Sequence, residues 1–179
     1  MTRSGPLAFI AAAAAYVAPA VLLASDVALV MFISTPGLFL QRVAMALFVP
    51  AIGGAALLAH DRARWQVGGG AALAAVGAVA ILLRPEALVV PTRPPAVLFP
   101  LGLLVLSAAM IGSAVSRRVA ALICAGALLF PLAHMSGVPA ALIGDDIIFM
   151  AAFWMLAPRM AGGNPKSQVP SPKSQGTGH

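Results

Sequence analysis

Two adjacent carboxylates, Asp145 and Asp146, lie inside the apolar run 138–157 near the C-terminus. A carboxylate at membrane depth is costly and is kept in a helical membrane protein for a reason. It binds a cation or a proton, or it forms a salt bridge to a neighbouring helix. Arg42 is the potential partner, because it interrupts a second apolar run in the N-terminal half.

The composition places these charges in an integral membrane protein. Hydrophobic residues make up 61% of the chain and charged residues 9%, whereas a soluble domain has about 25% charged residues. The net charge of +6 comes from basic residues that stand singly or in pairs between apolar runs. This pattern is typical of topology signals rather than of a nucleic-acid-binding face, so we expect the lipid bilayer as partner and no nucleic acid.

The apolar runs predict an all-α polytopic membrane protein, a compact bundle of about six transmembrane helices. The expected spans are 7–24, 38–59, 68–83, 96–115, 119–133 and 138–157. They form one domain over 1–160, and the Pro/Ser/Lys-rich stretch 161–179 is predicted to be a disordered cytoplasmic tail. For the first run, a cleaved signal peptide is the alternative interpretation.

The stretch 27–59 is too long to be one perpendicular span. As a single helix it would measure about 50 Å, against about 30 Å for the hydrocarbon core. Pro36-Gly37 is the natural breaking point, so we expect 27–35 to be a broken or re-entrant segment, or else part of a long tilted helix. Gly144-Asp145 is a possible second break, at which Asp145 would cap free backbone N–H groups.

The distribution of basic residues predicts the orientation. Six spans put both termini on one side, where most of the basic residues lie: Arg3, Arg62, Arg64, Arg117, Arg118, Arg159, Lys166 and Lys173. Only Arg84 and Arg93 flank the spans on the other side. The positive-inside rule therefore predicts a multi-pass protein of a bacterial-type inner (cytoplasmic) membrane with both termini in the cytoplasm.

This topology brings the charged residues to similar depths. Asp145 and Asp146 lie about 10 to 12 Å along the last span from its outer end, and Arg42 lies roughly 6 Å along the second span. Asp26 and His134 fall at the outer boundary. We therefore expect a substrate- or ion-binding site in the outer half of the bilayer, formed by Asp26, Arg42, His134, Asp145 and Asp146.

The sequence gives little support to enzymatic or cofactor chemistry. Cys124 stands alone, and the histidines and carboxylates have no metal-ligand spacing, so we predict no metal and no cofactor. No phosphate-binding loop, zinc-protease motif or nucleophile elbow is present. An enzyme is therefore the less favoured interpretation.

Two function classes remain. The first is a small transport or permeation protein in which Asp145 or Asp146 binds a cation or proton and Arg42 adjusts the charge of the site. The alternative is a non-catalytic accessory or assembly subunit of a larger membrane complex, in which Arg42 and Asp145 or Asp146 form a structural salt bridge. Its partners would be other membrane subunits or further copies of the chain.

Overall fold

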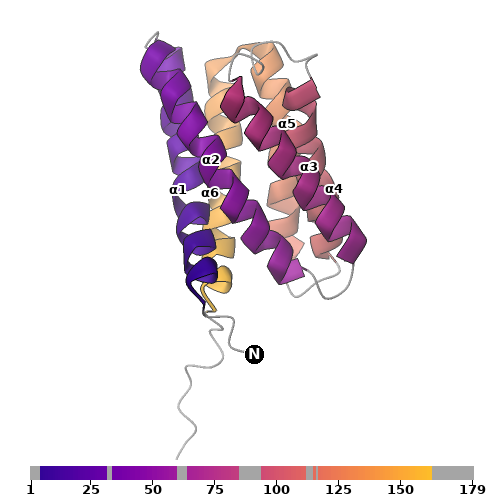
Figure 1. Ribbon diagram of the computed structural model, residues 1–179. Coiled ribbons are helices and arrows are strands. Elements are labelled where there is room, and N and C mark those ends of the chain that lie inside the picture. The colour runs from indigo at the N-terminus through magenta and orange to yellow at the C-terminus, as the bar shows by residue number, and fades with distance from the viewer. Residues whose placement is uncertain are drawn as a thin grey trace, which may run out of the picture.

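The computed structural model describes residues 5–31, 34–59, 64–84, 94–111, 115 and 117–162, and the described residues form α-helices joined by turns. The helices are α1 (Pro6–Val30), α2 (Ser34–Ala59), α3 (Arg64–Leu83), α4 (Pro94–Ile111), α5 (Arg117–Ser136) and α6 (Pro139–Met160) (Figure 1). The predicted all-α bundle is confirmed. Of the predicted tail, only Ala161 and Gly162 are among the described residues.

The helices are those of a polytopic membrane protein. Within the described residues, α1, α2, α3, α5 and α6 are long and apolar enough to cross a bilayer. The apolar part of α4, Val97–Ile111, is shorter. Side chains such as Phe9, Phe39 and Leu57 are exposed on the outside of the bundle, as expected of a surface that faces lipid rather than water.

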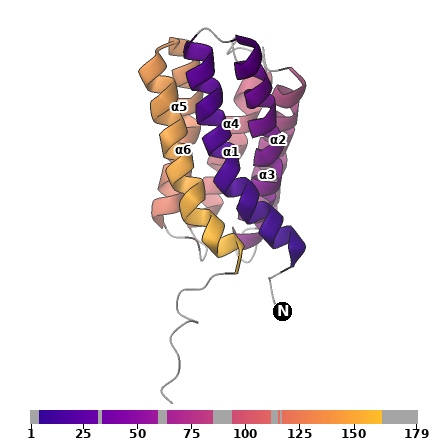
Figure 2. The same cartoon turned by 90° about the vertical axis from the view of Figure 1, so that its left-hand side faces the viewer.

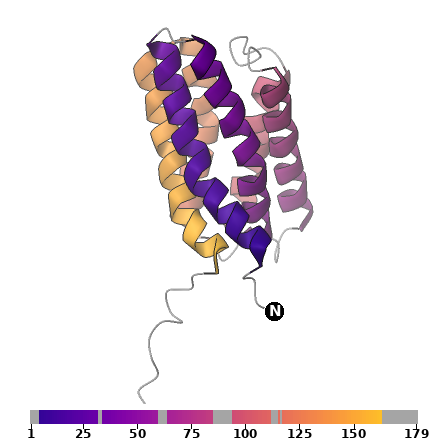
Figure 3. The ribbon, with the colours of Figure 1, turned by 60° about the vertical axis from the view of Figure 1, so that its left-hand side comes forward.

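The helices form a closed ring in chain order. Each helix packs against the next, and α6 packs back against α1. Figure 2 shows α1 beside α6, and Figure 3 shows α1 beside α2. Because successive helices run in opposite directions, α1 begins and α6 ends at the same end of the bundle. We call this the terminal end, and we call the opposite end, which holds Val30, Ser136 and Pro139, the distal end.

The long apolar stretch 27–59 is divided between two helices near Pro36-Gly37, but the division comes before this dipeptide rather than at it. Helix α1 continues through Ser25 and Asp26 to Val30, and α2 begins at Ser34, so the described part of 27–35 shows no separate re-entrant helix. Pro36 lies in the first turn of α2, where proline costs little because first-turn N–H groups have no helical partner. Helix α6 likewise runs through Gly144 without a break.

The start of α2 is held against α1 by direct contacts. Ser25 Oγ donates a hydrogen bond to the Gly37 carbonyl oxygen at 3.0 Å. A Cβ on Gly37 would come within 2.7 Å of the Leu29 side chain. The absence of a side chain at Gly37 therefore lets the two helices approach closely beside Asp26.

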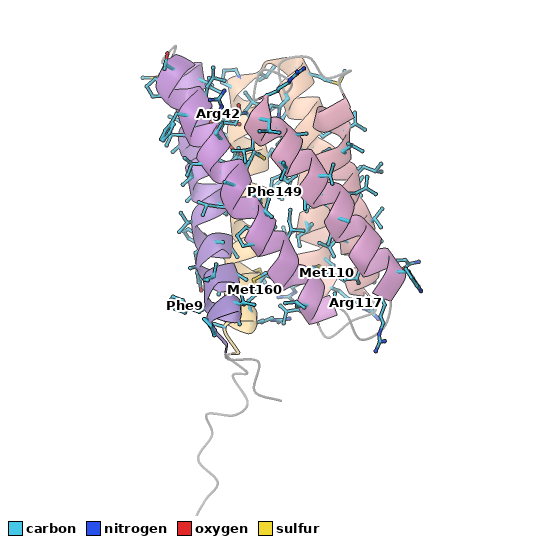
Figure 4. All side chains as sticks on the ribbon, viewed as in Figure 1. Phe9, Arg42, Met110, Arg117, Phe149 and Met160 are labelled. Carbon is cyan, nitrogen blue, oxygen red and sulfur yellow. The ribbon has the colours of Figure 1, made fainter. Side chains whose placement is uncertain are left out.

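A group of phenylalanines fills the middle of the bundle. Its members are fully buried, come from α2, α4, α5 and α6, and are Phe48, Phe99, Phe130, Phe149 and Phe153. Their neighbouring ring centroids lie 5.3 to 6.4 Å apart in tilted or edge-to-face arrangements, which are the favoured geometries for aromatic pairs. We call this group the aromatic core, and Figure 4 labels Phe149 within it.

Helix α6 is tied to α1 where Pro19 interrupts the helical hydrogen bonds. Pro19 has no N–H for the Ala15 carbonyl four residues earlier, and its ring crowds the turn that contains Ala15 and Tyr16. At this turn Trp154 Nε1 donates to the Tyr16 carbonyl oxygen at 2.9 Å, and the two rings lie 6.3 Å apart. The indole N–H thus has a backbone acceptor within the bundle, next to the turn that Pro19 disturbs, at a depth where lipid offers none.

We expect Trp154→Phe to lower the free energy of unfolding by about 1 to 3 kcal/mol, because the ring stays but the N–H donor is lost. Thermal unfolding in detergent measures the effect. Trp65→Phe is the matched control, since Trp65 is 93% exposed at the start of α3. Equal unfolding midpoints for the two variants would contradict a stabilising role for the Trp154 hydrogen bond.

Candidate functional site

Four of the predicted site residues come together near the distal end. Asp26 comes from α1, His134 from α5, and Asp145 and Asp146 from α6. The three aspartates are buried, with exposures of 1%, 1% and 0%, and the His134 side chain is 11% exposed. We call these four residues the carboxyl–imidazole cluster.

Both aspartates of α6 face the interior because this helix has partners on two sides. Helix α6 packs against α1 and against α5, so it buries a wide stripe of its surface. The stripe contains Asp145 and Asp146 together with the apolar residues that follow them at helical spacing, Phe149, Ala152, Phe153, Leu156, Ala157 and Met160. Adjacent side chains on a helix point about 100° apart, but the buried stripe of α6 is wide enough to keep both carboxyl groups inside the bundle.

The α5–α6 turn sets the position of His134 relative to the aspartates. Helix α5 ends at Ser136, Gly137 adopts a φ of +62°, and Pro139 is the first residue of α6. Ser136 Oγ donates to the Ala133 carbonyl oxygen at 2.9 Å and accepts from the Val138 N–H at 3.2 Å. A glycine in the left-handed region followed by proline makes a short, defined connection.

The orientation of the His134 ring is fixed by its own helix. Nδ1 lies 2.9 Å from the Phe130 carbonyl oxygen, and because a carbonyl can only accept, Nδ1 carries the hydrogen. The ring also contacts the Phe130 ring at a centroid distance of 4.3 Å. This leaves Nε2 turned toward α1, 4.0 Å from Asp26 Oδ2.

The carboxyl groups interact with one another as well as with His134. Asp145 and Asp146 are each close enough to Asp26 for electrostatic interaction. Asp26 and Asp146 approach within hydrogen-bonding range, but carboxyl groups form such a bond only when one of them is protonated. When ionised, these carboxyl groups can only accept hydrogen bonds. No donor among the described residues reaches either oxygen of Asp145, either oxygen of Asp146 or the Oδ2 of Asp26, all of which are buried.

Arg42 stands apart from the cluster. Its side chain is exposed, while its neighbour Gln41 is buried, because adjacent positions on a helix point about 100° apart. Figure 4 shows Arg42 in the distal half of α2. Among the described residues it forms no ion pair with Asp145 or Asp146, so the predicted salt bridge is not present, and any role of Arg42 in the site stays a prediction.

Two residues contribute to the cluster without having been singled out in the sequence. Phe130 supplies the carbonyl that orients His134, and Ser25 holds α2 beside Asp26. The spacing of four between Phe130 and His134 was the available signal, because residues i and i+4 lie on one helix face. Within the described part of the chain, no group of three or more His, Cys, Asp or Glu side chains is arranged to hold a metal ion.

The arrangement supports proton exchange among buried acids and an imidazole, since both kinds of group bind and release protons. Comparison of the chain with protein-family models, with curated proteins and with solved structures finds no match in any of the three.

Proposed function

We propose that this chain is a small membrane transport protein in which protons bind reversibly at the carboxyl–imidazole cluster. The observation that carries the proposal is the burial of three interacting carboxyl groups that have no arginine or lysine paired to them among the residues that the structure describes. Ionisable groups inside a membrane protein are expensive, and they mark ion pathways and proton relays.

The charge of the cluster supports protons as its ligand. With all carboxyl groups ionised, the cluster carries three negative charges, and a protonated His134 offsets only one of them. Several uncompensated charges within a bundle in lipid cost far more than the neutral forms of the same groups. Protons supply the missing compensation at the oxygen atoms themselves, and reversible binding couples the charge of the cluster to the proton gradient.

We further propose that the distal end faces the outside of a bacterial cytoplasmic membrane. Most basic residues flank the spans on the side of the terminal end, among them Arg64, Arg117, Arg118 and Arg159. The positive-inside rule assigns that side to the cytoplasm. The cluster then lies in the outer half of the bundle, where it exchanges protons with the external medium.

The accessory-subunit alternative receives less support. It explains the buried carboxylates as partners of Arg42 in a salt bridge between α2 and α6, and the described residues contain no such ion pair. Capture through the C-terminal tail tests it directly: recovery of a stoichiometric partner would favour it.

Proton flux into proteoliposomes tests the proposal. Vesicles contain a pH-sensitive dye, and a potassium gradient with valinomycin sets the membrane potential that drives protons inward. We expect wild-type vesicles to acidify faster than empty ones, because the cluster provides a binding site within the bundle. We expect Asp145→Asn and Asp146→Asn to lower the rate toward that of empty vesicles, since an amide cannot bind and release the proton.

The matched control is Ser107→Ala. Ser107 is buried in α4, and its hydroxyl donates to the Leu104 carbonyl oxygen of its own helix at 2.8 Å. Its removal changes a buried polar group outside the cluster, so the flux should stay at the wild-type rate. Equal flux in wild type, Asp145→Asn and Asp146→Asn, or no wild-type flux above empty vesicles, would overturn the proposal.

A further inference from the structure

We infer that His134 is the residue through which protons pass between the distal end and the buried carboxyl groups. This inference rests on the proposed function and assigns its entry route. Of the four residues in the cluster, His134 lies nearest a helix end, about 3 Å along the axis from the last residue of α5. It also has the only partly exposed side chain of the four.

The surroundings of His134 connect it to water on one side and to the cluster on the other. The residues that follow it, Met135, Ser136 and Gly137, are all exposed. Across the bundle its Nε2 lies 4.0 Å from Asp26 Oδ2, about 1 Å longer than a hydrogen bond. A small rotation of either side chain, or one bridging water, brings the two atoms within transfer distance.

The hydrogen bond at Nδ1 makes the ring suitable for this role. Because Nδ1 donates to the Phe130 carbonyl, the neutral ring presents the lone pair of Nε2 toward Asp26. Nε2 itself is buried and has no hydrogen-bond partner among the described residues, so the proton reaches it on a hydronium ion that enters beside the partly exposed ring. The hydronium gives its proton to Nε2 and leaves as water, and the imidazolium then releases the proton to the Asp26 carboxylate as the N–H bond breaks and the O–H bond forms. Nδ1 keeps its hydrogen throughout, so the ring returns to its starting tautomer.

From Asp26 the proton continues into the cluster. Asp146 lies within hydrogen-bonding range of Asp26, so a proton on one carboxyl group can be shared with and passed to the other. His134, Asp26 and Asp146 therefore form a series that runs from α5 across α1 to α6. The groups around His134 are Asp26 from α1 and Asp145 and Asp146 from α6, and the described length of α4 has no titratable side chain.

The aromatic core closes the route toward the terminal end. Phe149 follows Asp145 by one helical turn on the buried stripe of α6, and Phe130 precedes His134 by one turn on α5. Both rings are fully buried and lie 6.2 Å apart. Because this layer is apolar and closely packed, protons in this conformation exchange with the cluster from the distal end.

Chemical rescue in the proteoliposome assay tests the route. We expect His134→Ala and His134→Gln to lower proton flux by about 10-fold or more, at the low side of what a positioned proton donor contributes. Imidazole added to the medium should restore flux in His134→Ala, because a free base can occupy the space of the missing ring. It should not restore flux in Asp146→Asn, whose defect lies in the binding site.

A double variant separates transfer in series from general damage. If protons pass through both groups in turn, His134→Gln combined with Asp26→Asn should be no slower than the slower single variant, because residues that act as one unit are not additive. Ser107→Ala, which removes a buried hydroxyl outside the cluster, is the control and should keep wild-type flux.

The outcomes distinguish this inference from the function on which it rests. Wild-type flux in His134→Gln together with loss of flux in Asp146→Asn would overturn the His134 route and leave the proposed function standing. A slow His134→Ala variant that imidazole does not restore would also overturn the route, since the histidine would then be structural. No flux in the wild type above empty vesicles overturns both.

Discussion

Gly102→Ala is expected to lower the free energy of unfolding by about 3 kcal/mol, at the high end of the cost of overpacking. A Cβ on Gly102 would lie 2.6 Å from Ala74 Cα and 2.7 Å from the Gly70 carbonyl oxygen, and it would overlap the Ala74 backbone nitrogen. All three atoms belong to the backbone of α3 and cannot rotate away. The two helices must therefore move apart beside Gly102, and the close backbone contacts there are weakened.

Gly53→Ala provides the control for this substitution. Gly53 also lies inside a helix, α2, but a Cβ there meets nothing within 4 Å. Alanine has the higher helix propensity by about 1 kcal/mol, so this variant should be as stable as the wild type or more stable. Thermal unfolding in detergent compares the two. Equal midpoints for Gly102→Ala and Gly53→Ala would show that α3 and α4 do not pack through their backbones.

A second close contact between α3 and α4, that of Gly77 with Phe99, affects the centre of the bundle. A Cβ on Gly77 would overlap the backbone nitrogen of Phe99, and Phe99 contributes to the aromatic core. Small residues on α3 thus set how far Phe99 reaches into the bundle. We expect Gly77→Ala to disturb the aromatic core from a helix that contributes none of its rings.

The sequence alone predicts the helical class and the depth of the polar residues because both depend on distance along the helix. Hydrophobic length identifies the spans, and a rise of 1.5 Å per residue places Asp145, Asp146, Asp26 and His134 near the same end. In the structure these four residues do lie together.

The rotation of each helix about its axis is much harder to predict. In a helix of a soluble protein, the apolar stripe marks the buried face. A membrane helix is apolar both where it faces lipid and where it faces protein, so its sequence shows no such stripe. Only polar residues then report the inward direction, and Arg42 is misleading because its long side chain can reach the interface from an outward-facing position. This is why the depth of Arg42 suggested a partner that the structure does not provide.

The Pro-Gly signals were ambiguous for a different reason. Proline interrupts a helix interior but is well tolerated in a first turn, and the sequence does not show which of these positions Pro36 occupies. The predicted first span ended at residue 24, just before the polar pair Ser25-Asp26, yet both residues are buried within α1. The Ser25 hydroxyl donates to the Gly37 carbonyl oxygen. The Asp26 carboxyl group lies 4.0 Å from the His134 ring in the carboxyl–imidazole cluster.

Asp146→Leu is expected to raise the free energy of unfolding by about 1 kcal/mol or more at neutral pH, although the same substitution should abolish proton flux. The side chain is fully buried, and as acceptors its two oxygens have no partner among the described residues. Replacement of buried charged groups by hydrophobic residues of similar size is often stabilising. A site kept for function is expected to reduce stability in this way.

The sign of the change distinguishes the two function classes. If Asp146 were part of a structural salt bridge, loss of one partner would leave an uncompensated buried charge and lower the free energy of unfolding by about 3 to 5 kcal/mol. Unfolding midpoints of the wild type, Asp146→Leu and Ser107→Ala in the same detergent decide between these outcomes. Ser107→Ala is the control: Ser107 is a buried polar residue with a hydrogen-bond partner, so loss of its hydroxyl should be slightly destabilising. A large drop in the unfolding midpoint of Asp146→Leu would contradict the transport proposal and favour the structural interpretation. A variant that is more stable than the wild type but has no proton flux would identify Asp146 as a residue whose burial serves proton binding.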